Sequence, residues 1–477
     1  MGNGKEGRAL IGAGLKRLSR LAVAGALTVL ACARSDLPFN PARTLAPSSI
    51  TPTSSPIPSL LPSVVPSLTA TSTPELTPSP SPSATPNTTP TPTPATEVGY
   101  STAAASVSYR IPLTVRHVTS ETAVLFFELE VPAAGYLLYR PTKPGSVGWF
   151  LHPLDPGAAR HQIELVGLSA GAEYQARVGL GESLSDLRAP WLFGARWGDV
   201  TFETTELGSP ELRIGVIGDS GFGQRSTFDL AQLMASYRLD FVLHTGDLAY
   251  RVNEETDPVE GYAKKYFLNL APLLTSLPVY PVPGNHEYDL ETYWLDRPFY
   301  FYAFAGVGIQ GAANESWYSF SQAGIQFLML DSQVFHGEAG RASQTAWLAE
   351  RLADPSFRFS MPVFHTPPFT SGLHRNDGKA LAAEWLPRFE AAGVPLVLSG
   401  HDHNFERILF NGITYVVSGG GSRTLYPDSG FVPGSQAFAM QTHFVLLVIS
   451  SDRISVEAIN LADEVLDRAT IELEPGS

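Results

Sequence analysis

Short apolar runs separated by turn residues dominate residues 99 to 206. Turn dipeptides such as Pro144-Gly145 and Pro156-Gly157 separate the runs, which are rich in β-branched and aromatic residues. The runs are Ala123–Leu129, Gly135–Tyr139, Gln162–Leu165, Tyr174–Val178 and Val200–Thr204. Several short strands at this spacing predict a small all-β sandwich. This region has no cluster of catalytic residue types, so we expect a structural or docking role for it.

From about residue 210 the pattern changes to buried strand, polar loop and helix. The expected strands are Leu212–Ile217, Phe241–Leu243, Val279–Val282, Gln326–Leu330, Met361–Phe364, Pro395–Leu398 and Thr442–Ile449. The expected helices are Phe228–Tyr237, Gly261–Leu274, Ser343–Leu352 and Leu381–Ala391. This alternation predicts an α/β domain with layered β-sheets flanked by helices.

The start of the chain has the order of a secretory signal. A basic segment precedes the apolar run from Leu21 to Ala31, which is too short for a bilayer that needs about 20 residues. Cys32, the single cysteine, follows directly, and Val29-Leu30-Ala31-Cys32 resembles a bacterial lipobox, in which the cysteine becomes the lipidated N-terminus. The alternative is a plain signal peptide with an incidental cysteine. Either way, we expect an extracytoplasmic protein, secreted or anchored to a membrane only through a lipid on Cys32.

Proline, serine and threonine dominate from about residue 35 to residue 97, which predicts an extended, disordered tether. The whole chain of 477 residues has a formal net charge of −14, which argues against a nucleic-acid binder because such proteins show a basic surface. One cysteine excludes an intrachain disulfide and a cysteine-rich metal site. An anionic substrate stays possible, because a bound metal ion can dominate the local charge.

Metal-ligating residue types follow five of the predicted strands. The segments are Gly218-Asp219-Ser220-Gly221, Gly246-Asp247-Leu248-Ala249-Tyr250, Gly284-Asn285-His286-Glu287, His365, and Gly400-His401-Asp402-His403. The carboxyl ends of strands in an α/β sheet face a common crevice, so these side chains can meet at one point. Oxygen and imidazole ligands without thiolate suit Fe, Mn or Zn, and two such ions can clamp an in-line displacement at phosphorus.

These motifs, in this order, resemble the calcineurin-type metallophosphoesterase superfamily, and Tyr250 narrows the resemblance to purple acid phosphatases. Many superfamily members have a histidine two residues after the first aspartate, where this chain has Gly221. Purple acid phosphatases use instead a tyrosine three residues after the second aspartate, the position of Tyr250. The resemblance covers about residues 100 to 460, and residues 168–178 around Tyr174 resemble a corner of fibronectin type III-like domains, which often precede the catalytic domain.

We therefore expect four segments. They are a lipoprotein-type signal peptide over 1–31, a disordered tether over 32–98, a fibronectin type III-like β-sandwich over 99–206 and a metallophosphoesterase catalytic domain over 207–477.

The resemblance also implies a binuclear metal centre of Fe(III) with Fe(II), Zn(II) or Mn(II). The first metal would take Asp219, Asp247, Tyr250 and His403, and the second would take Asp247 as the bridge with Asn285, His365 and His401. It further implies that a metal-bound hydroxide attacks phosphorus. His286 would position phosphate and protonate the leaving oxygen, and the alternative is a histidine that only orients Glu287 or a ligand. His374 lies nine residues after His365 in a glycine-containing loop, where we expect it to contact substrate or to be an exposed loop residue.

Pro362 departs from the family pattern, which usually has valine there. Because proline cannot donate to a sheet ladder, we expect either an edge strand or a position beyond the paired region.

The leading hypothesis is a phosphatase of the acid phosphatase type that hydrolyses small phosphate monoesters. A phosphodiesterase or nucleotidase on the same centre and a catalytically silent surface binding protein are the alternatives.

Overall fold

The computed structural model of the chain describes residues 94–95, 97–145, 148–208, 211–252, 258–288, 300, 303–304, 316–336, 340–422 and 424–473. The predicted signal peptide, Cys32 and nearly all of the predicted tether lie outside these residues. None of the helices in the described part of the chain is long and apolar enough to cross a membrane.

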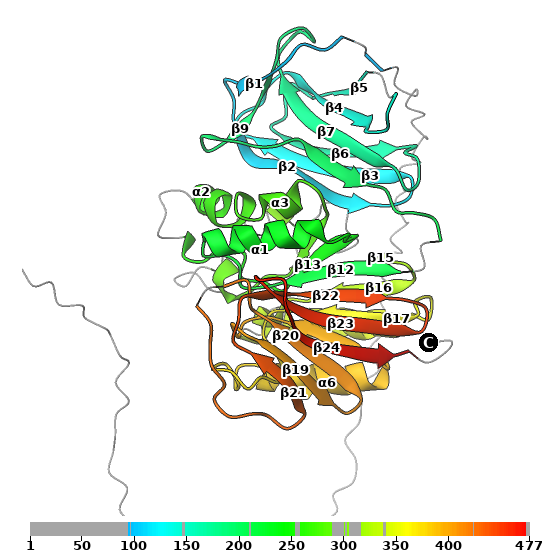
Figure 1. Cartoon of the computed structure of the whole chain (residues 1–477), viewed down its shortest axis with the longest axis vertical. Helices are drawn as coiled ribbons and strands as arrows, with labels where there is room; N and C mark the ends of the chain where they lie inside the picture. The colour runs from blue at the N-terminus through cyan, green and yellow to red at the C-terminus, as the bar shows by residue number, and fades with distance from the viewer. Residues whose placement is uncertain are drawn as a thin grey trace, which may run out of the picture. The chain divides into compact units, whose positions relative to one another are not determined.

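Two β-sheets form the region before residue 204 (Figure 1). One sheet has the order β1 (Tyr100–Ala104), β8 (Leu187–Ala189), β7 (Glu173–Leu180), β4 (Gly135–Pro141) and β5 (Phe150–Pro153), with β11 (Val200–Glu203) also paired to β7. The other has the order β10 (Ala195–Arg196), β9 (Trp191–Leu192), β2 (Tyr109–Val118), β3 (Thr122–Leu129) and β6 (Arg160–Val166). The Tyr174 hydroxyl accepts a hydrogen bond from the Ser169 N–H at 2.9 Å, which ties this corner to the backbone.

Two further sheets build the C-terminal domain. The first has the order β14 (Val279–Pro281), β13 (Phe241–His244), β12 (Leu212–Ile217), β22 (His443–Ile449), β23 (Arg453–Asn460) and β24 (Val465–Glu472). The second has the order β15 (Tyr318–Gln322), β16 (Ile325–Met329), β17 (Phe359–Val363), β18 (Leu396–Ser399), β20 (Ile413–Ser418), β19 (Phe405–Phe410) and β21 (Ser435–Ala439). Within them β12, β13 and β14 run parallel, as do β16, β17, β18 and β20.

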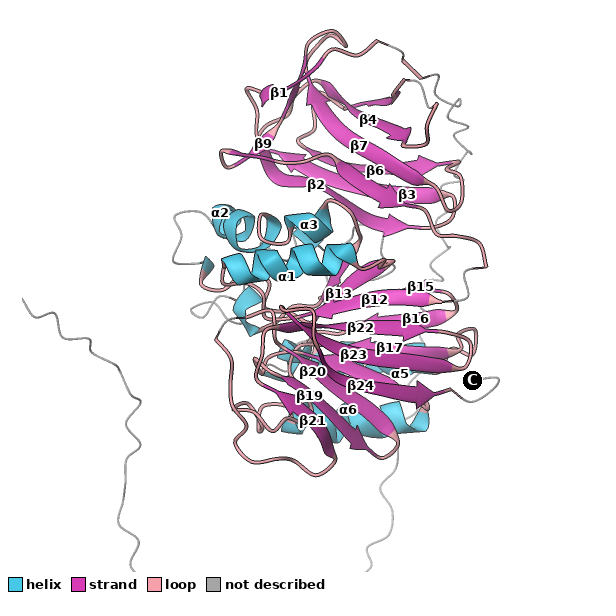
Figure 2. Cartoon of the chain, viewed as in Figure 1, coloured by secondary structure: helices cyan, strands magenta, loops and turns pink. Residues whose placement is uncertain are grey.

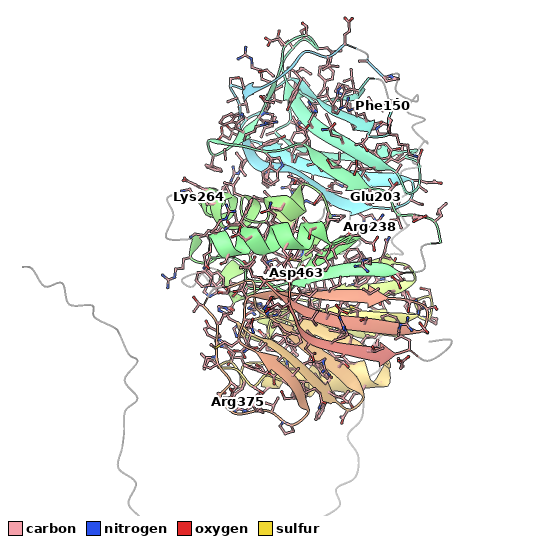
Figure 3. All side chains as sticks on the ribbon, in the orientation of Figure 1. Phe150, Glu203, Arg238, Lys264, Arg375 and Asp463 are labelled. Atoms are coloured by element: carbon pink, nitrogen blue, oxygen red, sulfur yellow. The ribbon has the colours of Figure 1, made fainter. Side chains whose placement is uncertain are left out.

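The two sheets pack face to face and helices cover their outer faces (Figure 2). Alternate residues of one strand serve different layers: Phe327 and Met329 of β16 pack between the sheets, whereas Leu328 packs towards the helices. The helices on the first sheet are α1 (Arg225–Ser236), α2 (Pro258–Tyr262) and α3 (Ala271–Leu274), and those on the second are α5 (Arg341–Leu352) and α6 (Lys379–Ala391). This arrangement confirms the predicted fold class.

The helix predicted over Gly261–Leu274 is interrupted. After α2 the chain forms a π-helical turn, η2 (Ala263–Phe267), in which the Leu268 N–H donates to the Ala263 carbonyl. A separate helix, α3, then begins with Pro272 in its first turn. Proline has no N–H to continue a preceding helix but is well tolerated in a first helical turn, which explains the break.

Pro362 lies inside β17, and β17 is not an edge strand. It pairs with Leu328 of β16, and β18 lies on the other side of β17. The Phe364 N–H donates to Leu398 of β18, so position 362, two residues earlier, faces the same neighbour. The only pair between β17 and β18 is Val363 with Leu398, and the missing N–H therefore falls beyond their paired region. The edge-strand alternative was wrong.

The β-sandwich and the C-terminal domain belong to one compact unit. The Thr201 N–H donates to the Thr275 carbonyl at 2.7 Å, and His117 Nδ1 lies 2.8 Å from the Tyr280 hydroxyl. These contacts reach α3 and β14, the elements that lie directly upstream of Asn285.

Candidate metal centre

The sequence-predicted ligands all follow carboxyl ends of parallel strands. Asp219 follows β12, Asp247 follows β13, Asn285 follows β14, His365 follows β17, and His401 and His403 follow β18. Tyr250 is on the same loop as Asp247. The fold therefore brings ligands separated by up to 184 positions in the sequence to one edge of both sheets.

Several of the predicted ligands have a strained backbone conformation. Asp219, Asp247 and His401 have φ angles of 58°, 56° and 71°, in the left-handed region that non-glycine residues rarely adopt. Each follows a glycine. At Gly218 an added Cβ would lie 1.9 Å from Thr245 Oγ1, so only glycine lets these loops approach so closely.

One group of ligand atoms surrounds the Tyr250 hydroxyl. The hydroxyl donates to Asp219 Oδ1 at 3.2 Å and lies 3.0 Å from His403 Nε2. His403 Nε2 is in turn 3.4 Å from Asp219 Oδ1. Burial and the charges of Asp247 and Asp219 raise the pKa of the Tyr250 phenol well above its usual 10, and a cation in contact with its oxygen would act in the opposite sense.

A second group surrounds His365 Nε2. This atom lies 3.1 Å from Asn285 Oδ1, 3.1 Å from His401 Nδ1 and 3.5 Å from Asp247 Oδ1. Carboxylate oxygens of Asp219 and Asp247 and a ring nitrogen of His365 lie within 4.8 Å of one another, which places Asp247 between the two groups.

The hydrogen bonds fix which nitrogen of each histidine is free of a proton. His365 Nδ1 donates to the Thr245 carbonyl at 2.8 Å, and His403 Nδ1 donates to the Thr424 carbonyl at 2.5 Å. His401 Nε2 donates to Asp377 Oδ2 at 3.2 Å. In the neutral form of each ring, the opposite nitrogen therefore presents a lone pair to the other ligand atoms.

Two unprotonated ring nitrogens this close repel each other unless both contact one cation. His365 Nε2 and His401 Nδ1 lie 3.1 Å apart, beside the Asn285 amide oxygen, and this spacing lets both bind one ion at about 2.0–2.1 Å. Asp219 and Asp247 are almost completely buried, and among the described residues neither is paired with a lysine or arginine. The donor set therefore fits two metal ions, one in each group.

Gly221 and Tyr250 are linked by packing. An added Cβ at Gly221 would lie 2.5 Å from the backbone of Ala249, and the Gly221 carbonyl accepts the Tyr250 N–H at 2.9 Å. The loop that carries Tyr250 thus occupies the space that a side chain at position 221 would need. A histidine at 221 is incompatible with this loop path.

His286 and His374 both line a cavity of about 320 Å³ that opens beside the ligand groups. The cavity is lined by Phe222, Asp247, Tyr250, Arg251, Asn285, His286, His374, His401, His403, Thr424 and Tyr426. The His286 ring centre lies 4.5 Å from that of Tyr250, and the His374 ring centre lies 4.0 Å from that of His401. Burial lowers the pKa of His286, and the charges of His365 and His401 add to this effect while Asp247 opposes it.

Aromatic rings brace two of the ligands. Phe222 stacks on Tyr250 with ring centres 3.9 Å apart, and Tyr426 stacks on His403 at 4.2 Å. The pairs are close to parallel, with interplanar angles of 17° and 10°. Both rings line the cavity, so they form its apolar walls next to the ligands.

Three carboxylates that support the site were not predicted in these roles. Asp377 joins His401 and His374, Glu287 accepts four backbone N–H groups, and Asp402 holds the loop before His374. Burial and the charge of Asp247 raise the pKa of Glu287, while its backbone donors act in the opposite sense. Glu287 and Asp402 lie within the ligand motifs, and this position could have indicated their supporting roles. For Asp377 the sequence offered only its position three residues after His374.

Comparisons with known proteins agree with this geometry. The profile of the calcineurin-like phosphoesterase family matches residues 212–405. Purple acid phosphatase 23 of Arabidopsis thaliana is 25% identical over 306 residues, which cover 57% of this chain and 64% of the relative. Acid phosphatase type 7 of Mus musculus is 25% identical over 273 residues, which cover 52% and 56%. The chain thus spans about half to two thirds of the length of these relatives.

Solved structures share the fold. A purple acid phosphatase from yellow lupin (Lupinus luteus) seeds superposes with a TM-score of 0.57 at 16% identity, covering 76% of this chain and 74% of the other. The structure of PhoD gives a TM-score of 0.55 at 14% identity, covering 76% and 89%. Residues 212–405 therefore match the calcineurin-like phosphoesterase family, and the chain is similar in sequence to purple acid phosphatases.

Proposed function

We propose that the protein is a binuclear-metal phosphatase that hydrolyses small phosphate monoesters. The observation that carries the proposal is the close pair of histidine ring nitrogens beside two buried carboxylates, next to a cavity that His401 and Asp247 line. The match of residues 212–405 to a phosphoesterase family supports the reaction class.

The ligand groups suggest how two ions would be held. Asp219, Tyr250 and His403 would hold the first ion, Asn285, His365 and His401 the second, and Asp247 both. We infer Fe(III) for the first position, because the Tyr250 motif resembles that of purple acid phosphatases and a phenolate is a hard, anionic oxygen ligand. The second ion would be Fe(II), Zn(II) or Mn(II). When bound, the ions supply Lewis acidity, which lowers the pKa of water at the site and neutralises phosphate charge.

The protein's own side chains would position the ester and move the proton. The His286 backbone N–H donates to Asp247 Oδ1 at 3.0 Å, and its ring lies against Tyr250, which sets His286 at the cavity wall. From there it can hold a phosphate oxygen and give a proton to the leaving oxygen. His374 also lines this cavity and can contact the substrate there.

A substrate panel tests the proposal directly. The purified protein would be analysed for metal content and assayed with alkyl and aryl phosphate monoesters, a phosphodiester and nucleotides. Turnover of monoesters with two metal ions per chain is expected. Faster turnover of the diester would assign the centre to phosphodiester hydrolysis, and full metal content without any turnover would indicate a silent binding protein.

We also propose that the protein acts outside the cytoplasm, held at a membrane by a lipid on Cys32. The basic segment, the apolar run and the lipobox-like residues before Cys32 support this proposal.

A further inference from the structure

One of the three ligand histidines differs from the others in what orients it. His365 and His403 each donate to a backbone carbonyl, that of Thr245 and that of Thr424 respectively. His401 donates instead to a side chain, the carboxylate of Asp377, at 3.2 Å. A backbone carbonyl cannot be removed by substitution, but this carboxylate can.

The same carboxylate oxygen also accepts a hydrogen bond from His374. Asp377 Oδ2 lies 3.0 Å from His374 Nδ1 and 3.2 Å from His401 Nε2. The two imidazole ring centres are 4.0 Å apart. With Nδ1 donating to Asp377, His374 keeps Nε2 as the nitrogen that can meet a substrate in the cavity.

The chain fixes the backbone of Asp377, and its side chain is 42% exposed. Its N–H donates to the His374 carbonyl at 3.0 Å, and α6 begins two residues later. Gly378 lets the chain pass over Pro367, because an added Cβ at this position would lie 1.9 Å from the Pro367 carbonyl oxygen.

Asp402 fixes the other end of the same loop. This fully buried carboxylate accepts the Thr370 hydroxyl at 2.6 Å, the Leu373 N–H at 2.9 Å and the His374 N–H at 3.2 Å. Because Asp402 lies between His401 and His403 in the sequence, the loop bearing His374 and Asp377 is tied to the ligand loop itself.

We propose that Asp377 is a positioning residue that orients two histidines with different tasks: it directs His401 Nδ1 at the second metal ion and His374 Nε2 at the substrate. This inference rests on the proposed function of the centre. Loss of Asp377 frees His401 to adopt the other tautomer, in which Nδ1 carries the proton and cannot bind a metal. It also frees the His374 ring to turn.

Metal retention tests the first half of the proposal without any assay of activity. The metal-loaded protein would be exposed to increasing EDTA, and the metal remaining on the protein would be measured by elemental analysis. Asp377→Ala should lose one of its two ions at EDTA concentrations about 10- to 100-fold below those needed for the parent protein, a typical effect of losing a carboxylate behind a metal-bound histidine. Asp377→Glu should restore part of the retention.

Two control variants separate Asp377 from its surroundings. Asp428→Ala removes a carboxylate that bonds only the Gly430 N–H of its own turn, and it should retain both ions like the parent protein. His374→Ala should also retain both ions but lose turnover. In the doubly substituted protein the loss of kcat should be smaller than the product of the two single losses, because Asp377 acts partly through His374.

The outcomes that overturn the proposal are distinct from failure of the phosphatase function. The positioning role would be refuted if Asp377→Ala retained metal like the parent protein and if the kcat loss of the double variant equalled the product of the losses in Asp377→Ala and His374→Ala. Three ions on the parent protein, with the third lost in both Asp377→Ala and His374→Ala, would replace it with a separate metal site at His374, Asp377 and His401. A protein that hydrolyses no phosphoester would refute the proposed function and leave the retention experiment decisive for Asp377 and His401.

Discussion

The Glu287 carboxylate accepts the backbone N–H of Asp247 at 2.9 Å, although the two residues belong to different strand-end loops. The same carboxylate accepts the N–H groups of Gly284 at 2.7 Å and of Leu248 at 2.8 Å. Glu287 therefore joins the loop that carries Asp247 and Tyr250 to the loop that carries Asn285 and His286. The Glu287 side chain therefore holds together Asp247, the proposed bridging ligand, and the loop of the proposed ligand Asn285.

Replacing Glu287 with glutamine should loosen both loops at once. The amide has a single acceptor oxygen, and its NH2 group would face backbone N–H donors that lose their partner. One buried unsatisfied group costs about 1–3 kcal/mol, and we expect the free energy of unfolding to fall by about this amount together with metal content. Denaturant unfolding and elemental analysis would measure the two effects. Glu350→Gln, an exposed change on α5, is the control, and equal losses in both variants would contradict the role of Glu287.

Tyr250 should give the protein its colour if the first ion is Fe(III). A phenolate bound to Fe(III) produces a broad visible charge-transfer band, and Tyr250→Phe should abolish that band while the Phe222 stacking surface is kept. The measurement is a visible spectrum with iron content determined on the same sample. An iron-loaded parent protein without the band would remove Tyr250 from the metal ligands.

The sequence predicted the candidate ligands at the strand ends better than the side chains that hold those ligands in place. Buried parallel strands appear as continuous apolar runs, and a glycine with a ligand residue follows several of them, so positions such as Asp219 and His401 could be recognised. Partners such as Glu287 and Asp377 depend on the path of loops that tertiary packing fixes. Strands such as β24, with its mixed exposed pattern, gave no continuous apolar run and were not predicted.

His443 should make the protein less stable in mild acid. Burial lowers the pKa of this fully buried histidine from 6.5 to about 4. The unfolded chain takes up a proton as pH falls below 6.5, whereas the folded protein does not until about pH 4. Stability from the neutral ring is therefore complete above pH 6.5 and is lost as pH falls from 6.5 to about 4, with a slope of about 1.4 kcal/mol per pH unit.

His443→Gln should remove this slope. Denaturant unfolding of both proteins between pH 4.5 and pH 7.5, about the range set by the two pKa values, gives the difference. Both proteins retain the same metal ligands, so acid effects on those ligands cancel in the comparison. Identical slopes would show that His443 binds no additional proton on unfolding.

Cys32→Ala should release the protein from the membrane fraction without changing its kinetic constants. A lipid on Cys32 would be the anchor, and the Pro-rich segment that follows would separate it from the folded domains. Cell fractionation with detection of the protein in membrane and medium is the measurement. Unchanged membrane association in the variant would exclude a lipid anchor at this position.

His286 and Asp247 should differ in what their loss removes. Asp247 lies between the two ligand groups, so Asp247→Asn should reduce metal content as well as activity. His286 contributes only its backbone N–H to Asp247, so His286→Ala should retain both ions and lose turnover. Metal loss in His286→Ala would make this residue structural to the centre.

The loss of turnover in His286→Ala should depend on the leaving group. An alkoxide is a poor leaving group without a proton, and general acid catalysis contributes about 10²–10⁴-fold, so an alkyl phosphate should show a large loss of kcat. A nitrophenolate leaves without a proton, so the loss on nitrophenyl phosphate should be small. The measurement is kcat for both esters, with metal content determined in parallel. Equal losses on the two esters would leave His286 with phosphate positioning alone, because positioning acts before the leaving oxygen gains charge and is indifferent to its basicity.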